Sequence, residues 1–171
     1  MLLVSNMSIG LLPRLGFALV RWRARRGLPE TLDAENDDPD LAEKYAAQRT
    51  GVLGELYAYW YLRRLGYLFI AKNYAPQHSK GEIDLVGYDG PTLVFVEVRT
   101  RSTSTAEGNT NYPEMTITPA KHHVLVRTAR YFLRERRIQE CPVRFDVVAI
   151  DNRPGRPPVL RLHKAALSPE A

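Results

Sequence analysis

The chain has 171 residues, of which 44% are hydrophobic and 25% are charged. This balance argues against a disordered or fibrous chain and is typical of one globular domain with an extension. Lysine and arginine outnumber aspartate and glutamate by 24 to 19, and the net charge of +5 favours polyanionic partners such as nucleic acid.

Cysteine usage limits the kinds of site that the chain can build. Cys141 is the only cysteine, so an intrachain disulfide and a multi-thiolate zinc site are both excluded. The histidines show no metal-ligand spacing. The apolar stretch Met1–Val20 is interrupted by Pro13 and Arg14, so we expect no secretion signal and no stable membrane span. These features predict a cytoplasmic protein.

Composition divides the chain into four parts. Residues 1–28 form a basic N-terminal extension, in which Ile9–Arg26 has the pattern of an amphipathic helix. This helix is interpreted either as a surface anchor or as a simple upstream extension. Residues 29–43 have the acidic, proline-containing composition of a linker. Residues 44–165 then form the folded domain, and residues 166–171 form a tail.

The domain is expected to begin with a buried helix. Thr50 is a suitable N-cap and Gly66 a suitable C′ residue for the helically spaced apolar run Gly51–Leu65. The next segment, Tyr67–Asn73, has the composition of a strand.

Two further runs, Glu82–Tyr88 and Thr92–Thr100, predict a β-hairpin. The pair Asp89-Gly90 between them suits a type I′ turn. The polar, glycine-containing segment Ser102–Asn111 follows as a loop.

A second helix and more strands complete the domain. Thr118 and Pro119 form an N-cap and N1 pair for a helix that continues to about Arg137. Val143–Asp151 is a further strand, and Val159–His163 adds a short last one. The order helix, three strands, helix, strand predicts an α/β fold with a mixed central sheet flanked by helices.

One strand carries an acid where an apolar residue is expected. Glu97 lies in a run of valines, where an unpaired carboxylate costs several kcal/mol. If Tyr88 pairs with Pro91 beside a two-residue turn, Asp84 lies opposite Phe95 and is a diagonal neighbour of Glu97. Diagonal neighbours stand about 7–8 Å apart, a span that one hydrated divalent cation can bridge.

Arg99 projects from the same strand face as Glu97, because it lies two positions further along the strand. Two carboxylates and a cation suit phosphodiester hydrolysis. Asp84 and Glu97 hold Mg²⁺, with Mn²⁺ as a possible replacement, and the arginine stabilises charge on the phosphate. The alternative is a solvated sheet face on which the acids merely pair with Arg99.

Two further residues are candidates with structural alternatives. Glu55 is a possible third acid of the site, but an acid near a helix N-terminus is also favourable through the helix dipole alone. Lys121 opens the second helix, where a cation is unfavourable to that dipole, so its interpretation as a phosphate contact stands beside simple surface exposure.

A row of arginines on the second helix is interpreted either as a solvated face or as a path for a phosphate backbone together with Arg99, Arg101 and Lys121. The row consists of Arg127, Arg130, Arg134 and Arg137.

Several short motifs, taken together, resemble one family. They are Gly54-Glu55 with Ala58, Asn73-Tyr74, Gly81-Glu82-Ile83-Asp84-Leu85, Val94-Phe95-Val96-Glu97-Val98-Arg99-Thr100-Arg101, Lys121, Ala129 and Arg144-Phe145-Asp146-Val147. In this order and spacing they resemble the bacterial YraN family. The resemblance covers roughly Leu41 to Asp151.

The resemblance implies a restriction-endonuclease-like fold, similar to that of archaeal Holliday-junction resolvases, and a dimer. It assigns Glu55, Asp84 and Glu97 to the acids of a PD-(D/E)xK site, with Arg99 in the lysine position. Arginine keeps the positive charge but does not readily release a proton. Charge stabilisation by this residue is therefore retained, whereas proton transfer is not.

Three hypotheses follow. The first is a Mg²⁺-dependent endonuclease-like protein that acts on structured or branched DNA. The second is a non-catalytic nucleic-acid-binding module on the same fold. The third is a protein-interaction domain whose basic surface meets an acidic partner or a membrane. Metal dependence separates the first from the second, because only an enzyme needs the ion to form product.

Overall fold

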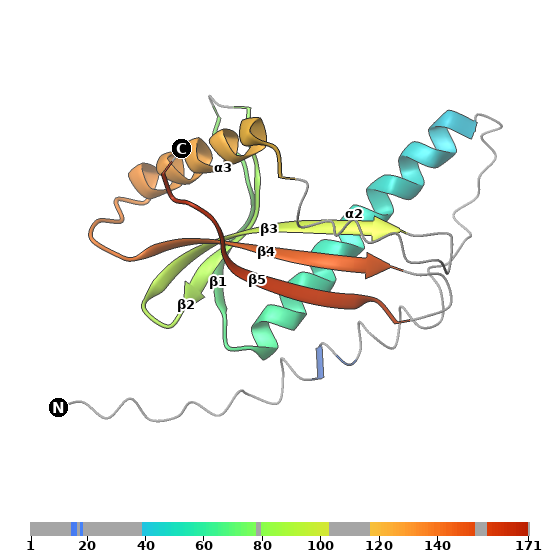
Figure 1. Cartoon of the computed structure of the whole chain (residues 1–171), viewed down its shortest axis with the longest axis horizontal. Coiled ribbons are helices and arrows are strands. Elements are labelled where there is room, and N and C mark those ends of the chain that lie inside the picture. The colour runs from blue at the N-terminus through green and yellow to red at the C-terminus, as the bar shows by residue number, and fades with distance from the viewer. Residues whose placement is uncertain are drawn as a thin grey trace.

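The predicted order of elements is confirmed in a computed structural model of the chain (Figure 1). The structure describes residues 15–16, 18, 39–77, 80–102, 117–152 and 157–170. Most of the predicted helix Ile9–Arg26 and of the predicted loop Ser102–Asn111 lies outside these residues. The elements are α2 (Pro39–Arg64), β1 (Leu68–Tyr74), β2 (Ile83–Asp89), β3 (Thr92–Ser102), α3 (Pro119–Glu135), β4 (Val143–Asn152) and β5 (Val159–Leu167).

The five strands form one mixed sheet in the order β1-β2-β3-β4-β5. Only β3 and β4 pair in parallel, and the other neighbours are antiparallel. A parallel pair needs a long crossover, which α3 provides between these two strands. The expected α/β fold with a mixed sheet is therefore confirmed.

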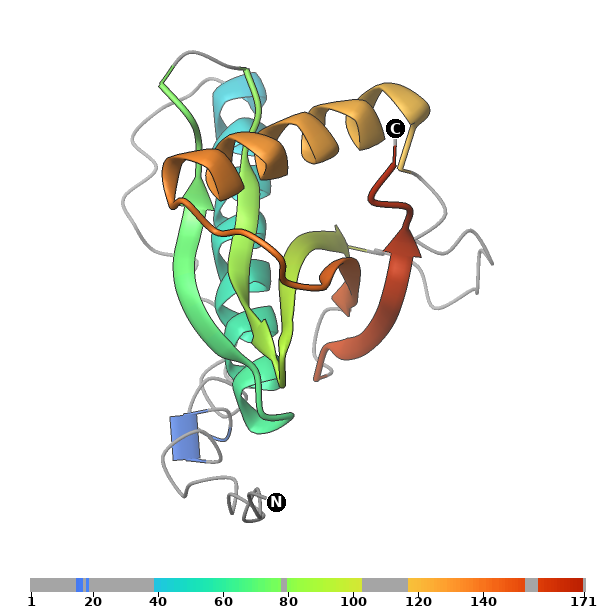
Figure 2. The same ribbon diagram turned by 90° about the vertical axis from the view of Figure 1, so that its left-hand side faces the viewer.

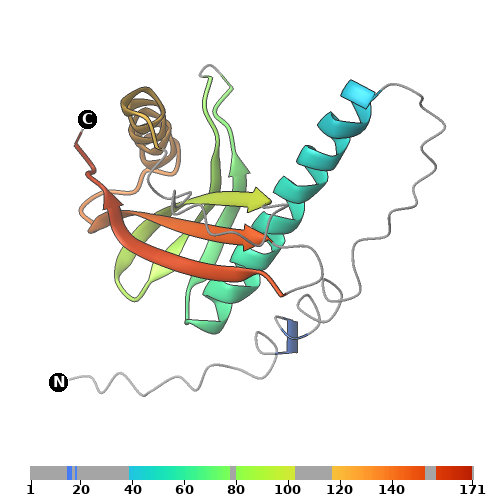
Figure 3. The ribbon, with the colours of Figure 1, turned by 45° about the vertical axis from the view of Figure 1, so that its right-hand side comes forward.

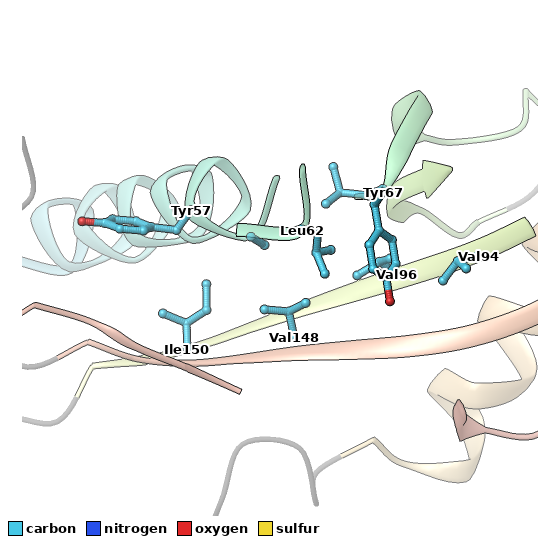
Figure 4. Close-up of a cluster of buried hydrophobic side chains, with 9 residues drawn as sticks. Tyr57, Leu62, Tyr67, Val94, Val96, Val148 and Ile150 are labelled. Carbon is cyan, nitrogen blue, oxygen red and sulfur yellow. The ribbon is translucent and has the colours of Figure 1, made fainter. Parts of the chain in front are cut away.

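The two helices cover opposite faces of this sheet (Figures 2 and 3). Side chains alternate along β3, so Val94 and Val96 pack under α2 whereas Leu93 and Phe95 pack under α3. Figure 4 shows the cluster of buried hydrophobic side chains that lies between α2 and the sheet. Its buried members are Tyr57, Ala58, Leu62, Tyr67, Leu85, Val94, Val96, Val148 and Ile150.

The prediction that the first helix starts after Thr50 is wrong, because α2 begins at Pro39. Residues 40–49 contain three alanines and several other good helix formers, and proline is well suited to the first position of a helix. Helix propensity thus extends the helix into residues 39–43, which were assigned to the linker.

The predicted register of the hairpin is also wrong. Asp89 pairs with Thr92 and Tyr88 with Leu93, so Gly90 and Pro91 form the turn. Proline has no amide hydrogen, so it cannot complete the closing pair with Tyr88 that the prediction required. Gly90, with φ 61°, adopts the left-handed conformation that the turn needs.

A buried carboxylate connects several elements near the β2–β3 turn. Asp146, on β4, is 1% exposed. It accepts hydrogen bonds from the Tyr67 hydroxyl (2.9 Å), Arg144 Nε (2.7 Å) and the Ala165 amide (2.9 Å). Arg144 also donates to Asp89 at the β2–β3 turn (2.6 Å). The network thereby joins α2's end, the turn and β5.

We expect Asp146→Ala to lower the free energy of unfolding by about 3–5 kcal/mol, because it leaves Arg144 without its buried partner. Urea denaturation measures this effect. Lys164→Ala is the control, since Lys164 is largely exposed and leaves Asp146 itself unchanged, contacting the network at Asp89 and over the Tyr67 ring. Equal destabilisation by the two substitutions would contradict the network's assigned role.

The glycine pair on α2 offers a matched test of helix packing. A Cβ on Gly54 would collide with Thr100 Oγ1 of β3, whereas a Cβ on Gly51 meets nothing. Gly51→Ala should stabilise the protein by about 0.5–1 kcal/mol through helix propensity. Gly54→Ala should destabilise it by about 1–3 kcal/mol, and a second change, Thr100→Ala, should restore most of the loss. Thermal unfolding of the four proteins checks the expected signs.

Candidate functional site

The site forms where β2 separates from β3. The regular pairing of the two strands ends at Leu85 and Val96. Continued by one residue, this register puts Asp84 opposite Glu97, whereas the predicted register made the two residues diagonal neighbours. The Val98 amide donates to Asp84 Oδ2 (2.6 Å), so a side chain replaces the next backbone acceptor of the ladder. The two predicted acids are brought together at this point, where the charge of Glu97 acts on Asp84.

Burial and the second carboxylate together disfavour the charge on Asp84. The pKa of Asp84 is raised from 3.8 to about 7, mainly by burial and next by the negative charge of Glu97. The Val98 amide and Lys121 act in the opposite direction. A carboxyl that titrates near neutrality is common at functional sites, because such sites place like charges together.

Glu97 is held by two cations. Its Oε1 lies 3.3 Å from Arg99 Nε and 3.2 Å from Lys121 Nζ. The N-cap of α3 positions the lysine, because Thr118 Oγ1 accepts the Lys121 amide hydrogen (3.2 Å). Glu97 is 5% exposed, and its other oxygen, Oε2, is buried without a hydrogen-bond partner. An unsatisfied buried carboxylate oxygen is unfavourable unless a ligand completes it.

The acid pair fits a divalent cation that keeps most of its water. Asp84 and Glu97 are oxygen donors on two neighbouring strands, and Glu97 Oε2 has no hydrogen-bond partner. No group of three or more histidine, cysteine, aspartate or glutamate residues is placed to hold an ion in the described part of the chain. Mg²⁺ commonly binds through one or two carboxylates plus water and substrate phosphate, so two acids are sufficient.

Glu55 stands further from the centre of the site. Its charge contributes to the raised pKa of Asp84, but less than the charge of Glu97 does. The close approach of Gly54 to Thr100 brings this part of α2 against β3. Glu55 is thus near enough to act on the acids electrostatically, and its role in catalysis stays a prediction.

The predicted nucleic-acid contacts fall into separate groups. Arg99 and Lys121 belong to the acid site, and Arg101 lies 3.4 Å from Asp151. Arg127 and Arg130 are exposed on α3, away from its sheet-facing side. The structure therefore does not join them to the acid site, and their contact with nucleic acid stays a prediction.

Asp151 and Arg161 form a further charged group, which the sequence alone did not indicate. Asp151 is 5% exposed near the end of β4 and lies between Arg101 (3.4 Å) and Arg161 (3.5 Å). The sequence does contain a sign of Asp151, because this acid directly follows the apolar run of a predicted strand. Glu97 is a comparable case, an acid within such a run. The pairing with β5 that brings Arg161 to Asp151 was not available from local sequence.

Comparison with known proteins places the chain in a family. A model described as "Uncharacterised protein family UPF0102" matches residues 54–150. The chain belongs to the UPF0102 family. UPF0102 is the YraN family, so the resemblance derived from the motifs is confirmed. The matched residues include Glu55, Asp84 and Glu97 together with the cations that hold them.

Individual UPF0102 proteins align over most of the chain. The UPF0102 protein of Koribacter versatilis is 35% identical over 139 residues, which cover 80% of this chain and 90% of its own. That of Dehalococcoides mccartyi is 37% identical over 127 residues, covering 74% and 98%. That of Chlorobium limicola is 41% identical over 100 residues, covering 58% and 73%.

The lengths and composition of the helices bear on the prediction that the chain has no stable membrane span. Within the described ranges, neither α2 nor α3 combines the length and the apolar character that crossing a membrane requires.

The raised pKa of Asp84 predicts how stability depends on pH in the absence of metal. Between about pH 4 and 7 the folded state holds a proton that the unfolded state has lost, so stability falls as pH rises through this range. Asp84→Asn removes this dependence and keeps an acceptor for Val98. With chelator present, the variant should gain about 1–3 kcal/mol relative to the parent protein between pH 5 and pH 8.

Urea denaturation at the two pH values measures this difference. Glu135→Gln is the control, because Glu135 is an exposed acid on the last turn of α3. Parallel pH profiles of the parent protein and Asp84→Asn would show that Asp84 titrates normally.

Proposed function

We propose that the chain is a Mg²⁺-dependent endonuclease-like protein that acts on nucleic acid, with structured or branched DNA as the favoured substrate. The observation that carries this proposal is the facing pair Asp84 and Glu97, with one carboxylate oxygen buried and without a partner beside two cations. Such a group combines metal ligands with charge stabilisation, the two needs of phosphodiester hydrolysis.

Asp84 and Glu97 are the proposed metal ligands. Bound Mg²⁺, or Mn²⁺ in its place, supplies Lewis-acid polarisation of the phosphate and lowers the pKa of a bound water. Glu97 contributes its unpartnered oxygen, and Asp84 must give up its proton for the pair to bind the ion. Metal affinity is therefore expected to increase as pH rises towards the pKa of Asp84, about 7.

Arg99 and Lys121 are the proposed phosphate contacts. Both reach Glu97 Oε1 and both remain about one third exposed at the side chain, 33% and 35% respectively. Each can therefore turn part of its charge towards an incoming phosphate. Guanidinium suits the planar contact with two phosphate oxygens, and the ammonium acts as a point charge.

Lys121 is also a candidate for the role of the lysine that is replaced by arginine at residue 99. The PD-(D/E)xK pattern has lysine there, and Arg99 cannot readily release a proton. Lys121 brings an ammonium group to the same carboxylate from a different element, α3. We assign to Lys121 the positioning of water or of a proton that Arg99 does not provide. The dimer and the cytoplasmic location implied at the outset stay predictions.

Cleavage of labelled branched and single-stranded DNA tests the proposal. The parent protein should give product with Mg²⁺ or Mn²⁺ and none with chelator. Glu97→Gln and Asp84→Asn should each lower the cleavage rate at least about 10²-fold, because each removes a charged ligand while keeping its shape. Glu135→Gln, an exposed acid outside the site, should cleave at the parent rate.

The same assay separates the enzyme from the non-catalytic module. Tight binding of DNA by the parent protein, with no product under any metal condition, would reject the nuclease and favour the binding module. Arg99→Lys then examines the reason, since restored cleavage would identify the arginine as the cause.

A further inference from the structure

A second charged cluster lies on the same sheet face as the acid pair. Beyond Phe95, this face of β3 carries Glu97, Arg99 and Arg101 in alternate positions. The strand pairings extend them into three rows across β4 and β5. The rows are Glu97–Val147–His163, Arg99–Ala149–Arg161 and Arg101–Asp151–Val159.

Apolar packing under α3 ends where this cluster begins. The buried side of α3 covers Leu93, Phe95 and Phe145, at the start of β3 and β4. Towards the other end of β3 this face carries charged side chains, and its arginines remain partly exposed. The side chains of Arg99, Arg101 and Arg161 are 33%, 27% and 28% exposed. A face of this kind is accessible to a charged ligand.

One buried carboxylate holds two of these arginines in place. Arg101 Nε lies 3.4 Å from Asp151 Oδ1, and both terminal nitrogens of Arg161 lie 3.5 Å from Oδ2. The carboxylate limits the movement of both side chains. Preorganised arginines lose less entropy when they bind a phosphate.

We propose that Arg101 and Arg161, oriented by Asp151, form a phosphate-backbone subsite that leads a nucleic-acid strand across β3, β4 and β5 to the acid pair. This inference rests on the proposed function, because it names the path of the same substrate. The family match ends at residue 150 and does not reach Asp151 or Arg161.

The subsite replaces the arginine row of α3 as the main backbone contact. Arg127 and Arg130 project from the exposed side of that helix, whereas Lys121 lies four and seven residues before Leu125 and Thr128, on its sheet-facing side. A strand that passes over the acid pair therefore meets Arg99, Arg101 and Arg161 first.

The salt dependence of DNA binding by the full chain tests the subsite. Binding of a labelled branched duplex is measured in chelator at several salt concentrations, so that no cleavage occurs. Arg101→Gln and Arg161→Gln should each reduce the slope of log affinity against log salt by about 1, as expected for one lost phosphate contact. The control, Lys72→Gln, removes an exposed cation from β1, at the opposite edge of the sheet from β5, and should keep the parent slope.

A charge-preserving variant guards against a folding effect. Arg161→Lys keeps a cation beside Asp151 and should keep the parent slope, and thermal unfolding is recorded for every variant. An unchanged slope in Arg161→Gln overturns the subsite. So does an equal loss of slope in Arg161→Lys and Arg161→Gln. Binding of polyglutamate as tight as that of DNA, and equally dependent on Arg161, would replace nucleic acid with an acidic protein partner.

The result is independent of the cleavage assay. Arginine-dependent slopes without any product uphold the subsite and reject the nuclease. Metal-dependent product with unchanged slopes upholds the nuclease and rejects the subsite.

Discussion

The hydrogen bond from the Val98 amide to Asp84 is the contact on which the site depends. It ends the β2–β3 ladder with a side chain instead of a backbone carbonyl, and this substitution brings a carboxylate to face Glu97. Two facing acids in a nearly dry position are unfavourable on their own. The rest of the site compensates for that repulsion, with Arg99 and Lys121 at one oxygen of Glu97 and a raised pKa at Asp84.

Compensation of buried acids recurs across the sheet. Glu97, Asp146 and Asp151 are each almost completely buried, and each is met by arginine or lysine from a neighbouring position. The basic partners differ in how much of each side chain is left exposed to solvent. Arg144 is bound by both Asp146 and Asp89 and serves the fold, whereas Arg99, Arg101 and Arg161 keep part of their surface exposed. Partly exposed arginines that are oriented by a buried carboxylate are suited to binding an anionic ligand.

Local sequence patterns predicted most elements to within a few residues. The Thr118 cap of α3 was correct, because capping depends on residues within one turn. The start of α2 was wrong, since helix propensity outweighed the acidic composition that suggested a linker. The hairpin register was wrong because the pair Asp89-Gly90 is a common turn sequence and was predicted as the turn. Pro91 cannot donate a hydrogen bond to a strand partner, so the turn is formed by Gly90 and Pro91.

The sequence by itself determined that Glu97 is exceptional, because an acid within a run of valines is visible without any partner. It also determined the alternation that puts Arg99 and Arg101 on the same face. Only the tertiary structure decided that Asp84 stands opposite Glu97, that Lys121 reaches the same carboxylate and that Arg161 meets Asp151. These contacts join separate elements, and local periodicity carries no information on which strands pair or where a crossover helix returns to the sheet.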